Sequence, residues 1–425
     1  MSENLPSWSH PVRGISRRTY QDLDLKILPP VGGGRSFGDS NFLGNQFSSC
    51  ADDKLMSLNT ETGEATFSGS VSIFDAINYL AQYKRTLVVI PGTMHATIGG
   101  CIASDIHGKN SHKKGPFSQH LLKFTLETKL GPVVVSDPDS ESWKCTVGGQ
   151  GLTGRIITAK VQTEELTSMF LVSTVKRTKN LEEHFDILHK QANEHDFAVG
   201  WIDGDTPGFR ERGYIEFCDE PSGLSDRHYE CPNSGTLWKS YFPRIKVVNW
   251  ATVWMFNLMN HGKSLIHSRK KRHTKRWNYM FPMAGLGNWN YFFGQSGFHE
   301  VQFSCSQENI KSAIGLMREI ISEQRIFLIG IKVMSGTQNG HLAFPGQEWS
   351  IAVNFPANSS TPLKVRGYQD QILQFGGRIN PTKDWCADDT IFQNMFPNWQ
   401  KVIEFRNIND INVQSNFSNR VGITL

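Results

Sequence analysis

The chain has 425 residues, of which 38% are apolar and 11% aromatic, enough to build the cores of two ordinary globular domains. Lysine and arginine outnumber aspartate and glutamate by 44 − 40 = 4, an excess that argues against a dedicated nucleic-acid binder but permits an anionic substrate. The seven cysteines form no CxxC pair and no Cys/His metal spacing, so we expect free thiols, a reducing compartment and no metal.

The N-terminal sequence, MSENLPSWSHPVRG, lacks the charged and apolar stretches of a secretory signal. The longest apolar run, residues 247–259, is interrupted by asparagines and is shorter than the roughly 20 residues that span a bilayer. We therefore expect a cytoplasmic protein that is soluble or peripherally attached to a membrane.

Three glycine-rich stretches occur in the first part of the chain, at residues 31–40 (VGGGRSFGDS), 91–119 and 148–154 (GGQGLTG). Backbone N–H groups in tight glycine turns form nests that bind phosphate, and only glycine lets a ligand approach the backbone closely. We interpret the stretches as one site for an extended anionic cofactor, with 91–119 a loop system too poor in apolar side chains to be a core element. Each stretch taken alone is more simply explained as an ordinary turn than as part of a cofactor site.

Strands are predicted at 64–69 and 86–90, and the spacing of Phe74, Ile77, Leu80 and Ala81 predicts a helix between them. Residues 149–154 match the letters of the GxGxxG fingerprint. The following RIITAKVQ alternates as a strand does, however, whereas a Rossmann turn opens a helix. This order favours an α+β cofactor domain over a doubly wound sheet.

From about residue 171 the pattern changes. Helices are predicted after Asn180, which can act as a cap, and after Ser306. Strand-like runs surround them at 197–202, 214–217, 300–304, 326–333 and 349–355. We expect an antiparallel sheet with helices on one face, forming a separate substrate domain.

Residues 238–283 are the least regular part of the sequence and include the basic cluster RKKRHTKR at 269–276. Charge alone favours a solvated loop, although a basic cluster beside the apolar run could also meet a membrane surface and a lipid phosphate through 247–276. After residue 378 the chain is expected to return to the cofactor domain, with a helical segment kinked near Pro397. The predicted domains are 1–168, 169–377 and 378–425.

The segments GGGRSFGDS, PGT…TIGGCIASDIHGKN and VGGQGLTGRI resemble, in this order, the FAD-binding segments of the vanillyl-alcohol-oxidase (PCMH-type) flavoproteins. The DIHGKN block resembles the decaprenylphosphoryl-β-D-ribose 2-oxidases in particular, and the similarity continues through Gln302, Lys332, Trp349 and FGGR at 375–378 to the C-terminus. It implies a two-domain PCMH-type flavoprotein that oxidises a secondary hydroxyl of a polyprenyl-phosphate-linked pentose by hydride transfer to flavin N5. The product would be a keto sugar for a cell-envelope polysaccharide, and a short-chain reductase partner would complete the epimerisation.

The resemblance also implies which residues hold FAD. Relatives that attach FAD covalently commonly use a histidine in the first glycine turn, where this chain has Arg35-Ser36-Phe37, so we predict non-covalent FAD. The expected cofactor-binding residues lie in the three glycine-rich stretches: Gly33, Gly34, Arg35, Ser36, Phe37, Gly38, Asp39, Pro91, Gly92, Thr93, Thr97, Gly99, Gly100, Ser104, His107, Gly108, Asn110, Gly149, Gly151 and Gly154.

Three residues are candidates for catalysis. His107 lies among glycines, which favours an active-site role over a structural one. Lys332 lies within an apolar strand, where a lysine is costly unless paired or functional, although a strand could equally point it to solvent. Lys383 matches an active-site lysine of the resembled oxidases. The candidate substrate-binding residues are Lys109, Trp201, Gln302, Lys332 and Asn380, of which Trp201 and Gln302 are implied by the resemblance alone.

At three positions the chain departs from the resembled family. Ala352 replaces a cysteine beside the flavin, and Phe37 and Asn380 replace tyrosines, which implies a differently shaped sugar pocket. Two alternatives remain at this stage. One is an alditol or aldonolactone oxidase that acts on free sugars with oxygen, and the other is a flavin-binding partner protein without catalytic activity.

Overall fold

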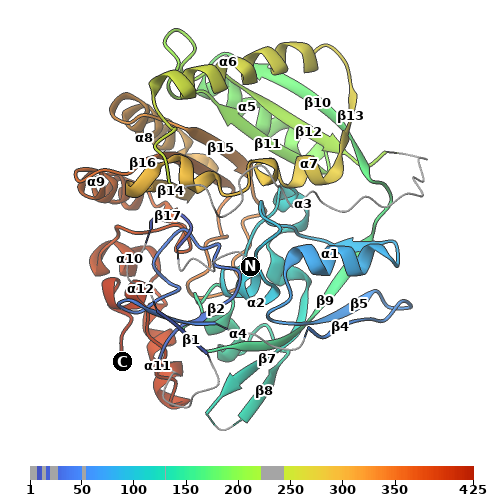
Figure 1. Ribbon diagram of the computed structural model, residues 1–425, viewed down its shortest axis with the longest axis vertical. Coiled ribbons are helices and arrows are strands. Elements are labelled where there is room, and N and C mark those ends of the chain that lie inside the picture. The colour runs from blue at the N-terminus through green and yellow to red at the C-terminus, as the bar shows by residue number, and fades with distance from the viewer. Residues whose placement is uncertain (1–6, 12–15, 20–26, 50–53, 130, 222–243) are drawn as a thin grey trace.

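The computed structural model describes residues 7–11, 16–19, 27–49, 54–129, 131–221 and 244–425. Helices and antiparallel sheets are mixed along the chain, which confirms the α+β class (Figure 1). The division of the chain into domains after residues 168 and 377 stays a prediction.

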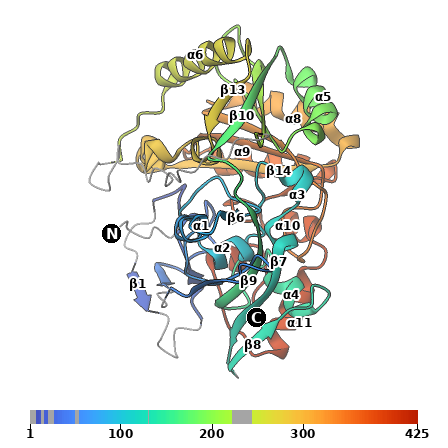
Figure 2. The same cartoon turned by 90° about the vertical axis from the view of Figure 1, so that its right-hand side faces the viewer.

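A six-stranded antiparallel sheet forms the lower part of the molecule in Figures 1 and 2. Its order is β4 (Met56–Leu58), β5 (Glu64–Ser68), β9 (Ile156–Glu165), β7 (Leu121–Thr128), β8 (Gly131–Val135), with β6 (Arg85–Leu87) also pairing with β9. Helix α1 (Ile73–Ala81) begins where the Ser72 side chain accepts a hydrogen bond from the Asp75 backbone, and its apolar side joins the core beside this sheet. The strand predicted at 64–69 and this helix are confirmed, whereas the strand predicted at 86–90 ends at Leu87.

The prediction that residues 91–119 form a loop system without core packing is wrong. The segment contains α2 (Ile98–Ala103), α3 (Ser111–Lys114) and a 3-10 turn at Phe117–His120. Met94, Ile98 and Ile102 are completely or almost completely buried in the core of the six-stranded sheet. The polar residues and glycines of this segment alternate with buried apolar side chains. The segment is therefore packed on the core and is not an exposed loop.

The eight-stranded sheet above it has the order β13 (Arg272–Lys275), β10 (Phe170–Thr178), β12 (Gly213–Asp219), β11 (Phe197–Ile202), β15 (Leu328–Val333), β16 (Trp349–Pro356), β14 (Phe298–Cys305), β17 (Arg378–Ile379). All its pairings are antiparallel, as predicted. Helices α5 (Leu181–Gln191), α8 (Ile310–Glu323) and α9 (Thr361–Gln374) share one apolar core with one face of the sheet. Asn180 caps α5, as its sequence position indicated.

Residues 244–283 are more regular than predicted. They form the 18-residue helix α6 (Trp250–His267), the edge strand β13 and the short helix α7 (Arg276–Met280). The predicted solvated basic loop is therefore largely an edge strand, in which Arg272 pairs with Glu216 at 2.9 Å and the buried Arg276 pairs with Glu220. Residues 238–243 of the predicted irregular stretch lie outside the described residues.

The remaining elements lie beside the first glycine-rich segment. A small parallel sheet joins β1 (Ser16–Thr19), β3 (Gln46–Ser49) and β2 (Pro30–Val31). The C-terminal helices α10 (Asp389–Met395), α11 (Trp399–Ile408) and α12 (Asn416–Arg420) follow, and Pro397 separates the first two where a kink was predicted. Helix α11 contacts α4 (Glu141–Thr146). Figure 1 shows these helices at the left of the lower half.

Among the described residues, the chain has no helix with both the length and the apolar character needed to cross a bilayer. Five cysteines, Cys101, Cys145, Cys218, Cys305 and Cys386, are buried free thiols. Cys50 and Cys231 lie outside the described residues.

Candidate active site

The three glycine-rich segments are in contact. An added Cβ at Gly33 would lie 1.9 Å from the His95 carbonyl oxygen, so residues 31–40 pack directly on the second segment and only glycine fits there. The backbone of Gln150, in the third segment, donates to the Ala103 carbonyl at the end of α2. The second segment thus lies between the other two, as the hypothesis of a single extended site requires.

The first glycine turn presents groups that lack a protein partner. Within the described part of the chain, the backbone N–H groups of Gly33, Gly34 and Arg35 donate to no protein acceptor. The Nε atom of Arg35 is also buried without an acceptor, and its guanidinium lies 4.3 Å from the centre of the Trp8 ring. Burial lowers the pKa of Arg35 to about 10, so the side chain stays cationic at neutral pH. A buried cation beside free N–H groups needs an anionic ligand.

One line of residues crosses the eight-stranded sheet on the face opposite α5, α8 and α9. Trp201 pairs with Gly330, Gly330 with Ala352, and Ala352 with Gln302. Directly paired residues share a face of the sheet, and so do residues two positions apart in one strand. Lys332 and Glu300 therefore lie on this face with what we call the Gln302 row: Trp201, Gly330, Ala352 and Gln302.

Gln302 connects the sheet to the glycine-rich segments. Its amide nitrogen lies 3.2 Å from His107 Nε2 and donates to Ser350 Oγ at 2.9 Å, while its oxygen accepts from Asn380 Nδ2 at 2.8 Å. Burial, followed by the charges of Lys332 and Lys383, lowers the pKa of His107 well below its ordinary value. The ring is therefore neutral at neutral pH, and its Nε2 acts as a hydrogen-bond acceptor toward Gln302.

Lys383 and Glu300 form an ion pair beside this network, at 3.3 Å between Nζ and Oε1. The Lys383 ammonium also lies 3.1 Å from the centre of the Phe37 ring, so the first glycine turn touches the pair. Burial lowers the pKa of Lys383, against the opposing effect of Glu300. Asn354 donates to the other Glu300 oxygen at 2.7 Å, which leaves the carboxylate fixed by two partners.

Two further half-buried lysines face the same region. Burial lowers the pKa of Lys332 to about 8, with smaller contributions from Lys109 and Lys383. Lys109 has its pKa lowered to about 8, also chiefly by burial, and its Nζ donates to the Tyr279 carbonyl and lies 4.0 Å from the Tyr279 ring centre. The site therefore combines three lysines with two carboxylates that are already paired: Glu300 with Lys383, and Glu216, which lies near Lys109, with Arg272.

The structure brings most of the predicted residues together, although some of their side chains have structural partners. Thr97 caps α2, Asn110 donates to the Val88 carbonyl, and Asp39 pairs with Arg420. Gly154 lies at the start of β9, near the Glu127 carbonyl. The buried Trp201 indole N–H has no acceptor among the residues that the structure describes.

Sequence reasoning missed Glu300, Ser350 and Arg420. The first two could have been found from the two-residue period of a strand, since Glu300 lies two positions before Gln302 and Ser350 two before Ala352. Arg420 gave no such signal, because its partner Asp39 is 381 positions away.

The comparisons with known proteins agree with this geometry. Residues 24–137 match the family model of an FAD binding domain. The chain is 27% identical over 390 residues, 88% of this chain and 84% of the relative, to the decaprenylphosphoryl-beta-D-ribose oxidase of Mycolicibacterium smegmatis. It is 35% identical over 334 residues, 73% of this chain and 88% of the relative, to an uncharacterized protein in the mprA 5′ region of Streptomyces coelicolor.

These findings define an FAD-dependent oxidoreductase. The chain belongs to the PCMH-type FAD-binding family, as its glycine-rich segments indicated. The residues present fit the cofactor, because the unpaired Arg35 Nε and the free N–H groups of the first glycine turn suit its pyrophosphate. Non-covalent attachment stays a prediction.

Proposed function

We propose that the protein oxidises a secondary hydroxyl of a sugar, a pentose linked to polyprenyl phosphate, to a ketone. The observation that carries the proposal is the cluster of Lys109, Lys332 and Lys383 beside Gln302, in a site whose neighbouring carboxylates Glu300 and Glu216 are already paired with Lys383 and Arg272. Such a site attracts an anionic substrate. The relative from M. smegmatis, whose name specifies a decaprenylphosphoryl ribose, supports the same choice.

When bound, FAD supplies the acceptor for the hydride that leaves the sugar carbon. The protein must orient the sugar and take the hydroxyl proton. Gln302 and Asn380 are placed to hold sugar hydroxyls, and the neutral His107, whose Nε2 accepts from Gln302, has an Nδ1–H group that can donate to the substrate. Lys332, with its lowered pKa and no described ion pair, receives the proton, whereas Lys383, in its ion pair with Glu300, stabilises the developing alkoxide.

The rate of flavin reduction should rise with pH through about 8. Below that pKa, Lys332 is protonated and cannot accept the proton, and above it the neutral amine predominates. Stopped-flow measurements under anaerobic conditions, from pH 6 to pH 10, would record the profile. The variant Lys332→Met should be slow and lose the inflexion near pH 8. An unchanged inflexion in this variant would assign the proton transfer to another group.

Anaerobic bleaching of the flavin tests the substrate. The purified flavoprotein is mixed with a polyprenyl-phosphoryl pentose, the corresponding pentose phosphate without the lipid, a free alditol and an aldonolactone. Reduction by the lipid-linked pentose at the lowest concentration is the expected result. Preference for the free alditol or aldonolactone would favour the free-sugar oxidase, and no bleaching by any compound would favour a non-catalytic flavoprotein.

The keto sugar is the natural substrate of a separate reductase, which would return a hydride to the opposite face and complete an epimerisation. The proposal includes membrane contact through residues 247–276, because the polyprenyl chain of such a substrate lies in a bilayer. It also includes a cytoplasmic location.

A further inference from the structure

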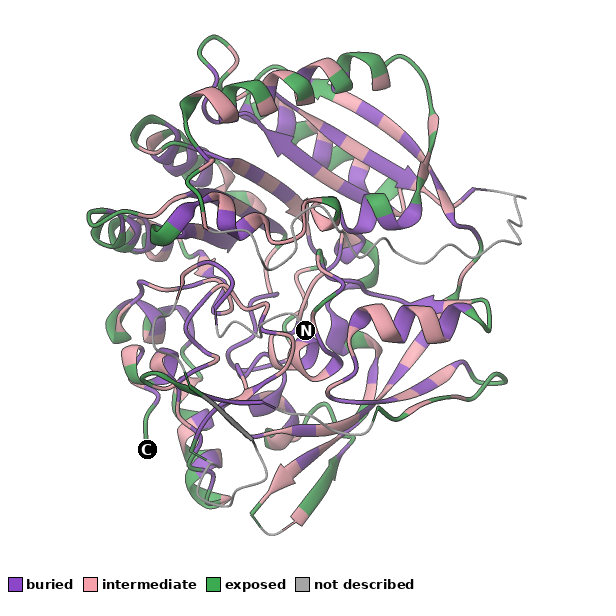
Figure 3. Cartoon of the chain, viewed as in Figure 1, coloured by how far each residue is buried: buried purple, intermediate pink, exposed green. Residues whose placement is uncertain are grey.

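Helix α6 has its polar and apolar sides reversed. Among its buried residues, Asn257, His261 and Ser264 are polar, and Val253 is the one apolar member. The helix also carries large apolar residues with high exposed fractions: Trp250 67%, Trp254 45%, Met255 55%, Met259 54%, Leu265 45% and Ile266 71%. By the helical repeat, Met255, Met259 and Ile266 lie opposite the buried side, whereas Trp250 and Trp254 lie nearer to it, at the N-terminal end of the helix. Figure 1 places α6 along the upper edge of the molecule, and Figure 3 shows exposed positions repeated along its outer side. A water-facing helix normally has the opposite arrangement.

Polar contacts fix this orientation. Asn257 Nδ2 donates to Asp203 Oδ1 at 2.8 Å, and His261 Nε2 lies 3.0 Å from Asp203 Oδ2. Asp203 is completely buried. Rotating the helix to hide its apolar side would remove these contacts and leave the buried Asp203 carboxylate with only Asp205 and Thr206 as donors among the described residues, through backbone N–H groups that both bond to Oδ1. The apolar side is therefore held outward.

The surroundings of α6 are basic. The sequence from 244 to 299 contains no aspartate or glutamate. Lys263 lies within α6, and Arg269, Lys270 and Lys271 follow its C-terminal end, all of them exposed. Exposed tryptophans near the start of the helix and exposed lysine and arginine near its end suit the interface of an anionic bilayer, where aromatic rings lie at headgroup level and basic groups meet lipid phosphates.

The inner side of α6 reaches the candidate active site. The His261 ring lies 5.4 Å from the ring of Trp201, which belongs to the Gln302 row. The helix thus covers the outer part of the sheet face on which that row lies. A surface docked through α6 would be close to one end of the proposed substrate site.

We propose that the apolar outer side of α6, together with Lys263 and residues 269–271, docks the protein on the surface of an anionic lipid bilayer. The helix lies in the interface without crossing it. The same basic residues disfavour a second copy of this chain as the occupant, because a symmetric contact would bring like charges together. The inference depends on the proposed function in one respect: that function gives the reason for membrane binding, which is access to a lipid-linked substrate.

Vesicle co-sedimentation of the full flavin-loaded protein tests the inference. The protein should bind vesicles that contain phosphatidylglycerol and should bind vesicles of phosphatidylcholine alone much more weakly. The triple variant Trp250→Ser, Trp254→Ser, Ile266→Ser should lose at least about tenfold in binding. Its matched control is Leu363→Ser with Ile408→Ser, which removes two side chains that are 78% and 83% exposed on α9 and α11 and should change nothing.

The charges are tested separately. Lys263→Gln, Lys270→Gln and Lys271→Gln should each lower binding to anionic vesicles by about fivefold. Lys311→Gln and Lys401→Gln, which change exposed lysines on α8 and α11, should have no effect. The inference is wrong if the apolar variant binds like the wild type, if neutral vesicles bind equally well, or if ultracentrifugation shows a dimer that the apolar variant converts to a monomer. Vesicle binding without oxidation of any lipid-linked sugar would refute the proposed function and leave this inference intact.

Discussion

Replacing Lys383 by methionine is expected to slow substrate-dependent flavin reduction by about 10²–10³-fold. The change removes the cation that stabilises the developing alkoxide and leaves Glu300 without its 3.3 Å partner inside the site. It also removes the ammonium from the face of Phe37. The measurement is single-turnover reduction in an anaerobic stopped-flow instrument, with the flavin content of each preparation determined from its absorbance.

The matched control for this variant is Lys364→Met. Lys364 lies on α9 and forms an exposed ion pair with Glu323, on the face of the sheet opposite the Gln302 row, so its loss should leave the rate within about twofold. Equal rates for the Lys383 variant and wild type, at full flavin content, would remove Lys383 from the chemistry. A parallel loss of flavin and activity would instead make it a cofactor-binding residue.

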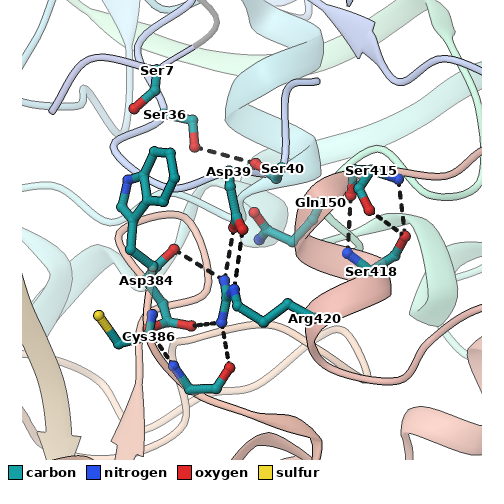
Figure 4. A network of polar contacts seen from close by, with 12 residues as sticks. Ser7, Ser36, Asp39, Ser40, Gln150, Asp384, Cys386, Ser415, Ser418 and Arg420 are labelled. Carbon is teal, nitrogen blue, oxygen red and sulfur yellow. Dashed lines mark hydrogen bonds and ion pairs between the residues drawn. The ribbon is translucent and has the colours of Figure 1, made fainter. Parts of the chain in front are cut away.

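Replacing Arg420 by methionine is expected to destabilise the protein by about 3–5 kcal/mol, the cost of leaving buried carboxylates unpaired. Arg420 on α12 makes two hydrogen bonds to the Asp39 carboxylate, at 3.0 and 2.7 Å, and one to the Asp384 carboxylate at 2.7 Å (Figure 4). Both carboxylates are almost completely buried, and burial raises the pKa of Asp39 while Arg420 opposes that rise. Because Asp39 belongs to the first glycine-rich segment, the variant should also retain less FAD.

Urea unfolding and flavin content measure the two effects. Arg318 provides the control, since it also pairs with two carboxylates, Glu182 and Glu211, but is 45% exposed. Arg318→Met should cost no more than about 1 kcal/mol, because water already screens its partners. If the two arginine variants proved equally stable, the contacts of Arg420 would contribute no more than an ordinary surface ion pair.

Much of the fold was predictable because its signals are local. Helix α1 follows from apolar spacing and the Ser72 cap, α5 from Asn180, and β9 from the alternation of residues 156–162. Helix α6 was missed because its inner residues are polar and their partner, Asp203, lies 54 and 58 positions away. Helix α2 was missed because its sequence, IGGCIA, contains two glycines and has the composition of a loop.

The candidate site was predictable only in its parts. The sequence indicates His107, Lys332 and Gln302 as candidates, and the period of a strand puts Glu300 on the same face as Gln302. It does not show that β15, β16 and β14 are neighbours, because strand order depends on contacts between distant segments. The meeting of Lys332, Lys383 and His107 therefore required the three-dimensional structure.

The bond between Asp39 and Arg420 also sets an order of events during synthesis. These two residues are separated by 381 positions, so at about 5–20 residues per second a ribosome needs about 20–75 s to supply the second after the first. During that interval the first glycine turn lacks its hydrogen bonds from Arg420. Thr382, whose carbonyl accepts from the Phe37 and Gly38 amides, is made only shortly before Arg420. These contacts of the first glycine turn are therefore completed only when translation is nearly finished, although the segment matched to the FAD binding domain is made first.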